Sequence, residues 1–524
     1  MNIKKCAVLT LSLCLLLTGC GTKKPAETTP STTEKNTFLD ALIPYATEIF
    51  LSDDGITVDG KAVSNDTAEA VYTANDIVYY EAGKDFTYGE GTKEDEHTKE
   101  EADAHTVVHI TKPGTYALSG KLSAGQIAVD LGEDAKKDPN AVVTLELHGV
   151  DLTCTVAPAV IFYNVYECGS TDESKATMEV DTSKAGANVV IADGTENKVN
   201  GAYVAKIYKS VELNEAGTEV VDSKKLHKYD GAFYSKMSMN IVGGPKGDGL
   251  LSITATNEGL DSELHLTLLG GNINIRSGND GINTNEDNIS VTAIKGGNLN
   301  ITVTGQTGEG DGIDSNGWLV IDGGTVTASA CATSGDAGID ADKGVYIRGG
   351  TVIAGGNMLD HFEAMQTSVL FAFNGRQNGG ETYTLKQGDQ TVMTATPANA
   401  FQYLILSSPD LTEGVYQLYR GESQLVGTSG GMHGGRPMGG QMPEGMTPPE
   451  GPQRPGKPEG TQKPEEMIPP EGMAPPEGVF TPAPGGTQGF PQMPGNTQQP
   501  TGEGSKDFTF VKGYNTFSIT GIAE

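Results

Sequence analysis

The sequence is poor in cysteine, tryptophan and positive charge, and these shortages exclude several classes of protein. It contains 6 cysteines, 1 tryptophan and 36 lysines and arginines against 68 acidic residues, which gives a formal net charge of -32. Beyond the N-terminal segment only Cys154, Cys168 and Cys331 remain, and an odd number without C-x-x-C spacing argues against a disulfide framework and a zinc site. The acidic surface repels nucleic acid, so no nucleic-acid partner is expected.

The apolar stretch near the N-terminus is too short to span a membrane, but the regions around it follow one another as in a lipoprotein signal peptide. Lys4 and Lys5 precede an apolar stretch over residues 7–17, roughly half of the ~20 residues that a spanning helix needs. The sequence LTGC ending at Cys20 has the pattern of a lipobox, which predicts cleavage before Cys20 and lipidation of its thiol. The mature chain is therefore expected on the extracellular face of the cell membrane, lipid-anchored, as in a Gram-positive bacterium.

Composition and patterning divide the chain into segments. Residues 21–36 are rich in Thr, Lys, Pro and Glu, and residues 430–505 hold 17 of the 26 prolines, so neither stretch is able to form a packed core. Residues 366–429 alternate as antiparallel strands, and residues 506–524 regain strand character. The predicted segments are a signal peptide (1–20), a flexible tether (21–50), a repeat domain (51–360), a β cap (361–429), a disordered Pro/Gly/Met-rich segment (430–505) and C-terminal strands (506–524).

Internal periodicity is the most informative feature of the repeat domain. Gly-Gly steps followed by alternating apolar residues begin at Gly270, Gly296, Gly323 and Gly349, at spacings of 26, 27 and 26 residues. Helical periodicity is missing from this region, and the leucine-rich repeat signature is absent. The pattern predicts an all-β fold, a right-handed parallel β-helix (solenoid) with a small C-terminal antiparallel β cap. Two polar insertions, residues 167–187 and 206–227, should leave this solenoid as loops from one face.

A second repeat, out of phase with the first, carries carboxylates and amides next to glycine. Side chains at the same phase of successive coils lie about 4.8 Å apart, so these residues should form columns of oxygen ligands. Unbridged columns of like charge are destabilising, and such ligands suit Ca²⁺. The alternative is that these side chains only serve the Gly-flanked turns. The predicted calcium ligands are Glu258, Asp261, Asp280, Asn283, Asp311, Asp314, Asp336 and Asp340, with Asn316 and Asp342 close enough to contribute.

The motifs taken together resemble a known family. The lipobox, the sequences TYALSG over 115–120, GQIAVD over 125–130 and DGTEN over 193–197, and the repeated Asp-Gly-Ile and Gly-Gly-Thr steps are similar to clostridial-type surface proteins described as carbohydrate-binding domain-containing. The resemblance covers roughly residues 104–420. It implies a polysaccharide-lyase-like β-helix that carries calcium and binds cellulose-like or acidic pectic polysaccharides. The chain departs from the family pattern by its two insertions and by Glu258 and Asp261, where the family leads us to expect Asp and Lys.

Three functions remain open from the sequence. Polysaccharide binding is favoured, with Trp318 and Tyr346 as candidates for stacking on sugar rings, although core or edge packing is the alternative for each. A calcium-dependent pectate-lyase-like enzyme would also need a cationic base. The candidates for that base are Arg276, Lys295, Lys343 and Arg348, although such cations commonly serve surface solvation. The third possibility is a structural surface adhesin with a protein ligand.

Overall fold

The computed structural model describes residues 46–430 and 504–523, and this part of the chain is almost entirely β. Within it, one short α-helix, α1 (Lys99–Asp103), and two 3-10 turns, η2 (Glu133–Lys137) and η3 (Glu173–Lys175), stand among the strands. The prediction of an all-β fold is confirmed. The cysteines of this part, Cys154, Cys168 and Cys331, are all free thiols.

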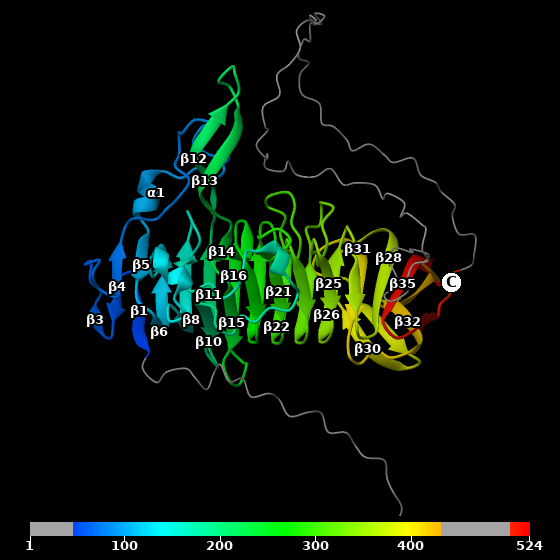
Figure 1. The fold of residues 1–524 in the computed structure, drawn as a ribbon. Coiled ribbons are helices and arrows are strands. Elements are labelled where there is room, and N and C mark those ends of the chain that lie inside the picture. Colours follow the sequence, from blue (N-terminus) through cyan, green and yellow to red (C-terminus); the bar gives the residue numbers. More distant parts are fainter. Residues whose placement is uncertain (1–45, 431–503, 524) are drawn as a thin grey trace, which may run out of the picture. The chain divides into compact units, whose positions relative to one another are not determined.

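Most strands belong to three ladders of parallel neighbours, and Figure 1 shows many of them standing side by side along the stack. The first ladder consists of β1 (Thr47–Leu51), β6 (Gly114–Leu122), β8 (Val143–Cys154), β10 (Ala187–Ile191), β15 (Met239–Gly243), β18 (His265–Leu268), β21 (Val291–Ile294), β23 (Trp318–Ile321), β25 (Gly344–Ile347) and β27 (Phe362–Ala364). The second consists of the end of β8, then β11 (Glu196–Gly201), β16 (Leu250–Ala255), β19 (Asn272–Ser277), β22 (Asn298–Val303), β24 (Thr325–Ser329) and β26 (Thr351–Gly356). The third consists of β5 (Thr106–Ile110), β7 (Gly125–Asp130), β9 (Val160–Asn164), β14 (Gly231–Ser235), β17 (Glu258–Ser262) and β20 (Ile282–Thr284).

The chain visits the three ladders in a fixed order. It passes through β18, β19 and β20 and returns to the first ladder as β21, one position further along the stack. Equivalent residues of successive passes are paired, so Phe233, Leu260, Ile282 and Ile313 follow one another along the third ladder. All four side chains have 0% exposure. Because neighbouring residues of a strand point to opposite faces, the residues beside this apolar column point outward.

The Gly-Gly steps turn the chain from the first ladder into the second. Gly271, Gly297, Gly324 and Gly350, the second glycine of each step, have φ between 74° and 90°, which residues with a side chain rarely adopt. A Cβ atom on Gly297 would also lie 2.5 Å from the carbonyl oxygen of Gly271. Glycine is therefore required here both for the backbone conformation and for the close approach of the next turn.

The two insertions differ in structure. Residues 167–187 form an irregular segment that includes η3, whereas the expected loop at 206–227 is an antiparallel hairpin of β12 (Val204–Leu213) and β13 (Val220–Tyr229), so the loop prediction is wrong there. The hairpin projects from the neighbouring strands (Figure 1). Its two arms pair from Val204 with Tyr229 to Leu213 with Val220, so their backbone groups bond to each other and not only to water, as they would in an open loop.

The two ends of the described chain are mainly antiparallel, with β28 and β35 as a parallel pair in the C-terminal unit. Near the N-terminus, β2 (Thr57–Val58) and β3 (Lys61–Ala62) pair beside β1, and β4 (Val71–Ala74) pairs with β5. The C-terminal unit contains β28 (Ser368–Gln377), β29 (Tyr383–Gln387), β30 (Gln390–Ala395), β31 (Phe401–Ser407), β32 (Gly414–Arg420), β33 (Ser423–Ser429), β34 (Phe508–Phe510) and β35 (Tyr514–Ile522). Strand β31 pairs antiparallel with β26, the last strand of the second ladder, and β35 pairs with β28 and β33.

The predicted signal peptide with Cys20, most of the predicted tether and nearly all of the predicted Pro-rich segment lie outside the described residues. Among the helices of the described part, none has the length and apolar character of a membrane span.

Shortening Leu260, a member of the buried column of the third ladder, tests the inward placement of this column. We expect Leu260→Ala to lower the free energy of unfolding by about 3 kcal/mol, because it removes buried methyl groups and leaves a cavity. The measurement is urea unfolding followed by circular dichroism. Thr254→Ala, at an exposed position of β16, is the control and should change stability by less than about 0.5 kcal/mol. Equal effects of the two substitutions would contradict the placement.

Candidate functional site

The outward face of the third ladder gathers most of the acidic side chains singled out from the sequence. In one column of this face, Asp261 is paired in register with Asn283. The column continues through the next two passes, because Ile282 pairs with Ile313 and the amide of Asp340 donates a hydrogen bond to the carbonyl of Ile313. A neighbouring column of this face contains Glu258, Asp280 and Asp311. A third contains Lys236, Glu263, Asn285, Asn316 and Asp342, whose amides each donate to the preceding pass.

Three carboxylates form what we call the first acidic cluster: Asp230, Glu258 and Asp261. One oxygen from each lies within 4.8 Å of the others, and all three residues are buried. Burial, followed by repulsion from neighbouring carboxylates, raises the pKa values of Glu258 and Asp261 well above their ordinary range. The buried cluster therefore needs a nearby cation or bound protons to offset its negative charge.

Hydrogen bonds satisfy only part of this cluster. The side-chain amide of Asn283 donates to Glu258 Oε1 at 3.1 Å, and that of Asn285 donates to Asp261 Oδ1 at 2.6 Å. Glu258 Oε2, Asp261 Oδ2 and Asn283 Oδ1 are buried with no hydrogen-bond partner. Buried polar atoms are nearly always bonded, and an unmet carboxylate oxygen is costly. Unmet carboxylate and amide oxygens are donors of the kind that Ca²⁺ accepts.

Lys228 is the cation that the structure places at this cluster. Its Nζ lies 2.5 Å from Asp230 Oδ2. Burial alone would lower the pKa of Lys228, but Asp230 and the other two carboxylates outweigh it and hold that pKa above its usual value. The single ammonium group of Lys228 is thus attracted by three carboxylates but pairs directly only with Asp230.

The second acidic cluster comprises Asp311, Asp314 and Asp340, which offer oxygens within 4.8 Å of one another and are partly exposed. Burial, with the charge of Asp280 as the next cause, raises the pKa of Asp311 to about 9. The carboxylate of Asp280 accepts a hydrogen bond from the amide of Asp311 at 2.6 Å, and Asp311 accepts one from the amide of Ala337. Asp280 and Asp311 therefore each bind the backbone of the next pass.

The predicted calcium ligands thus fall into two groups: those whose oxygens gather in an acidic cluster and those that accept hydrogen bonds from backbone amides of the turns. Asp336 accepts a hydrogen bond from the amide of Gly310 at 2.7 Å and, like Asp280, serves a Gly-flanked turn. Sequence reasoning missed Asp230 and Lys228, both from the end of the projecting hairpin. The Asp-Gly step at Asp230 repeats those at Asp280 and Asp311 and was an available signal, whereas nothing in the repeat marks Lys228.

The four cationic candidates do not converge on either acidic cluster. Arg276 is exposed on β19 of the second ladder, and Lys295 is exposed in the turn after β21. Lys343 is exposed just before β25. Arg348 is held in place by Asp322, at 2.7 Å from Nε, and by Glu179.

Trp318 and Tyr346 lie on another ladder from the acidic clusters. Trp318 is half-buried on β23, where it packs with Met178 and Val180 of the 167–187 insertion against Val320. Tyr346 is paired in register with Val320 on the next strand. The insertion therefore gives Trp318 a packing role on the outside of the first ladder.

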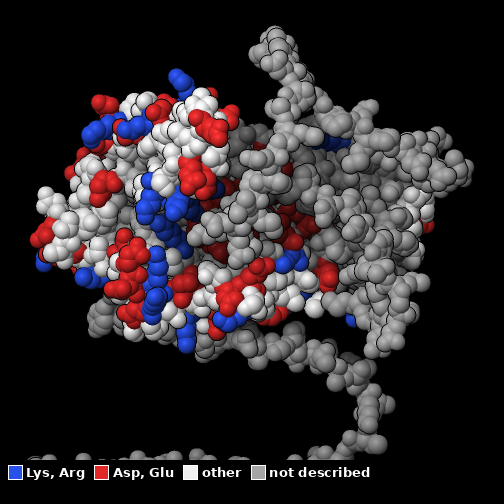
Figure 2. Space-filling model, turned by 45° about the horizontal axis from the view of Figure 1, so that its top comes forward, with Lys and Arg blue, Asp and Glu red and all other residues white. Residues whose placement is uncertain are grey.

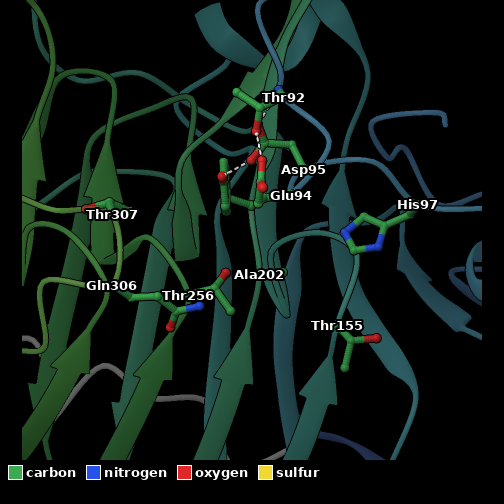
Figure 3. Close-up of a pocket in the computed structure, with 10 residues that line it drawn as sticks. Thr92, Glu94, Asp95, His97, Thr155, Ala202, Thr256, Gln306 and Thr307 are labelled. Atoms are coloured by element: carbon green, nitrogen blue, oxygen red, sulfur yellow. Dashed lines mark hydrogen bonds between the residues drawn. The ribbon is translucent and has the colours of Figure 1, made fainter. Parts of the chain in front are cut away.

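A cavity of about 580 Å³ lies near the first acidic cluster. Its wall consists of turns that follow strands of the second ladder and of a segment before α1, and its lining residues are Thr92, Glu94, Asp95, His97, Thr155, Ala202, Tyr203, Thr256, Gln306 and Thr307. Figure 3 shows Thr92 linked by hydrogen bonds to Glu94 and Asp95 on one wall of the cavity. Thr256 and Ala202 lie on the opposite wall. Tyr203 donates to Asp95 and so ties the two walls together. Thr256 lies two residues before Glu258, so the cavity adjoins the acidic face.

The comparisons with known proteins agree on one family. The sequence model of a family described as carbohydrate-binding domain-containing protein matches residues 104–398. A protein of Acetivibrio thermocellus with the same description is 29% identical over 171 residues, which make up 32% of this chain and 45% of that relative. The chain thus spans less than half the length of this relative.

A solved structure is also similar. It is the polysaccharide lyase-like protein from C. thermocellum, as a gadolinium derivative, with 20% identity and a TM-score of 0.32, over 58% of this chain and 84% of that one.

Removing the cation of the first acidic cluster tests whether its carboxylates depend on it. Lys228→Met should lower the free energy of unfolding at pH 8 by about 2 kcal/mol in the absence of divalent ions, because it leaves the three carboxylates without a counter-charge. The folded-state pKa values of these carboxylates are raised, so their destabilising charge grows as pH rises above about 4. The loss measured by urea unfolding should therefore shrink from pH 8 towards pH 4.

The control for this substitution is Lys121→Met, which removes an exposed ion pair with Asp151. It should cost less than about 1 kcal/mol at either pH. A loss for Lys228→Met that is the same at pH 8 and pH 4 would contradict the dependence on the carboxylates.

Proposed function

The chain belongs to the family of carbohydrate-binding domain-containing proteins, and we propose that it binds polysaccharide on a right-handed parallel β-helix stabilised by calcium ions. The three parallel ladders, visited in a fixed order, support this architecture. Cellulose-like and acidic pectic glycans are the two polysaccharide classes that we propose.

The observation that carries the calcium proposal is the set of unpartnered oxygens in the first acidic cluster. Glu258 Oε2 and Asp261 Oδ2 are buried, carry the oxygen chemistry that calcium prefers, and lack hydrogen bonds. Lys228 supplies one positive charge to three carboxylates, so a divalent ion would neutralise the remainder. We infer that Asp230, Glu258, Asp261 and Asn283 hold one ion, and that Asp311, Asp314 and Asp340 hold another.

We place a sugar unit in the cavity beside the first acidic cluster. Sugar hydroxyls both donate and accept hydrogen bonds, and the cavity lines up threonine hydroxyls, the amide of Gln306 and the carboxylate of Glu94. Because the cavity wall continues through Thr256 to Glu258, ion binding would also fix the wall that contacts the sugar. This link is our reason for expecting binding to depend on calcium.

The N-terminal pattern supports a location on the extracellular face of the cell membrane, with a lipid on Cys20 as the anchor. The net charge of -32 supports a protein that does not bind nucleic acid. Binding is favoured over lyase chemistry because three of the four candidate bases, Arg276, Lys295 and Arg348, belong to the other two ladders, and only Lys343 follows a residue of the acidic face. An assay for unsaturated uronate products should therefore show no activity.

Calcium should raise the melting temperature of the protein, since an ion that binds only the folded state stabilises it. We expect a rise on the order of 5 °C at a concentration well above the dissociation constant. Asp261→Asn should reduce this rise, and so should the double substitution Asp311→Ala with Asp314→Ala. In chelator, Asp261→Asn should melt at a higher temperature than the wild type, because it removes a buried charge. Differential scanning fluorimetry measures the melting temperatures of the wild type and of both variants, with calcium and with chelator.

Asp54→Asn, at an exposed position, is the matched control and should keep the full calcium effect. Identical calcium responses in the wild type and in the Asp261 and Asp311/Asp314 variants would exclude these clusters as the ion sites.

Filling the cavity should abolish sugar binding without unfolding the protein. Thr256→Tyr places a ring in the cavity from an exposed position, and we expect at least a tenfold loss of affinity for soluble polysaccharide in affinity electrophoresis. Thr254→Tyr, two residues earlier on the same exposed face of β16, lies outside the cavity and is the control. Equal affinities of the two variants would place the sugar elsewhere.

A further inference from the structure

One cation on the acidic face has no carboxylate of its own. Lys236 follows β14 and occupies the outward column that continues through Glu263 and Asn285. Among the described residues its ammonium group forms no ion pair, although the chain carries 68 acidic residues. It lies instead 5.4 Å from the ring centre of Tyr163 and 5.5 Å from that of Tyr229. Both distances are within the range of cation–π attraction.

The aromatic side chains around Lys236 are fixed by one another. The rings of Tyr163 and Tyr229 meet edge to face at 5.6 Å, and those of Tyr229 and Tyr234 lie 5.1 Å apart. The hydroxyl of Tyr229 also forms a hydrogen bond with His227 Nδ1 at 2.5 Å. Tyr229 and Tyr234 are buried, and Tyr163 is partly buried beside the ammonium group. The lysine is therefore held in a preformed aromatic frame that remains open at Tyr163.

The acidic neighbours of Lys236 are engaged by other groups. Glu263 binds Lys225 at 3.2 Å and also accepts a hydrogen bond from the Tyr234 hydroxyl. Glu133 binds Lys136 at 3.1 Å. Burial lowers the pKa of Lys236 and the positive charge of Lys136 lowers it further, while Glu263 acts in the opposite direction. Lys136 and Lys225 are thus each paired with a carboxylate, and an anion would neutralise the charge that remains on Lys236.

We propose that Lys236, backed by Lys136 and Lys225 and bordered by Tyr163, is a binding subsite for the carboxylate of a uronic acid unit. We call it the lysine subsite; it rests on the proposed function and assigns an acidic polysaccharide to it. The ammonium group pairs with the carboxylate, and the exposed part of the Tyr163 ring borders the C–H face of the sugar. Figure 2 shows Lys and Arg side chains gathered together on a face that otherwise carries many Asp and Glu.

The location of the lysine subsite fits a polymer more closely than a free anion. Lys236 belongs to the column next to that of Asp261, and both columns run along the same ladder. A chain of uronate units lying along this ladder would place one carboxylate at Lys236 and others near the proposed calcium ions. The ammonium group of Lys236 and a bound calcium ion would then neutralise different carboxylates of the same polysaccharide chain.

The test compares a charged ligand with its neutral counterpart. Isothermal titration calorimetry in excess calcium would use an oligogalacturonate and the same oligosaccharide with its carboxyl groups reduced to alcohols. We expect Lys236→Met to weaken binding of the oligogalacturonate at least tenfold and to leave the reduced ligand unaffected. Lys236→Arg, which keeps the charge, should restore part of the affinity.

Lys386→Met is the matched control, because its ammonium group lies 4.7 Å from the ring of Tyr419 in the C-terminal unit, far along the chain from the acidic face. It should bind both ligands as the wild type does. Unchanged oligogalacturonate affinity in Lys236→Met would overturn the lysine subsite while leaving the proposed function intact. Failure of the wild type to bind either ligand or a soluble cellulose-like oligosaccharide would instead overturn the proposed function. Equal competition by inorganic phosphate would also reject the subsite as one for uronate.

Discussion

The register of the third ladder is the constraint on which the proposed site depends. Because Leu260, Ile282 and Ile313 stack inward, the residues that follow them stack outward at the spacing of neighbouring strands, about 4.8 Å. Most of those residues are acids or amides, so the apolar core and the array of oxygens are two sides of one arrangement. Relaxing the repulsion by shifting the register would turn the core outward, which makes a bound cation the less costly solution.

Much of this arrangement could be predicted from the sequence, because it depends on periodicity. The spacing of the Gly-Gly steps gave the number of residues per pass, and the phase of Asp261, Asn283 and Asp314 relative to the isoleucines placed them in one outward column. The turn role considered for such residues also has examples, since Asp280 and Asp336 bind backbone amides. Periodicity identifies which side chains share a column, but it does not decide which of them accept hydrogen bonds from the next turn.

Features that depend on segments without a repeat could not be predicted. Asp230 and Lys228 reach the first acidic cluster from the hairpin β12–β13, which the sequence suggested as a loop. The cavity needs Asp95 to meet Tyr203, 108 residues away. The sequence made Trp318 a candidate for stacking on a sugar, but it packs together with Met178 and Val180, from an insertion with no regular pattern, against Val320. In each case a contact distant in sequence changes the environment of a correctly placed strand.

Net charge is a poor guide to what such a face binds, because its influence is screened over about 8 Å at physiological ionic strength. A ligand carboxylate therefore responds to the groups directly around it. At the first acidic cluster these are carboxylates that lack enough counter-charge, whereas Lys236 lies near two lysines that already have carboxylate partners and is itself left without one. The acidic surface would repel a polyanion everywhere except where a lysine or a bound cation reverses the local potential. A strongly acidic protein of this kind would recognise an acidic polymer by the spacing of those few positive positions, so that selectivity comes from the ladder register.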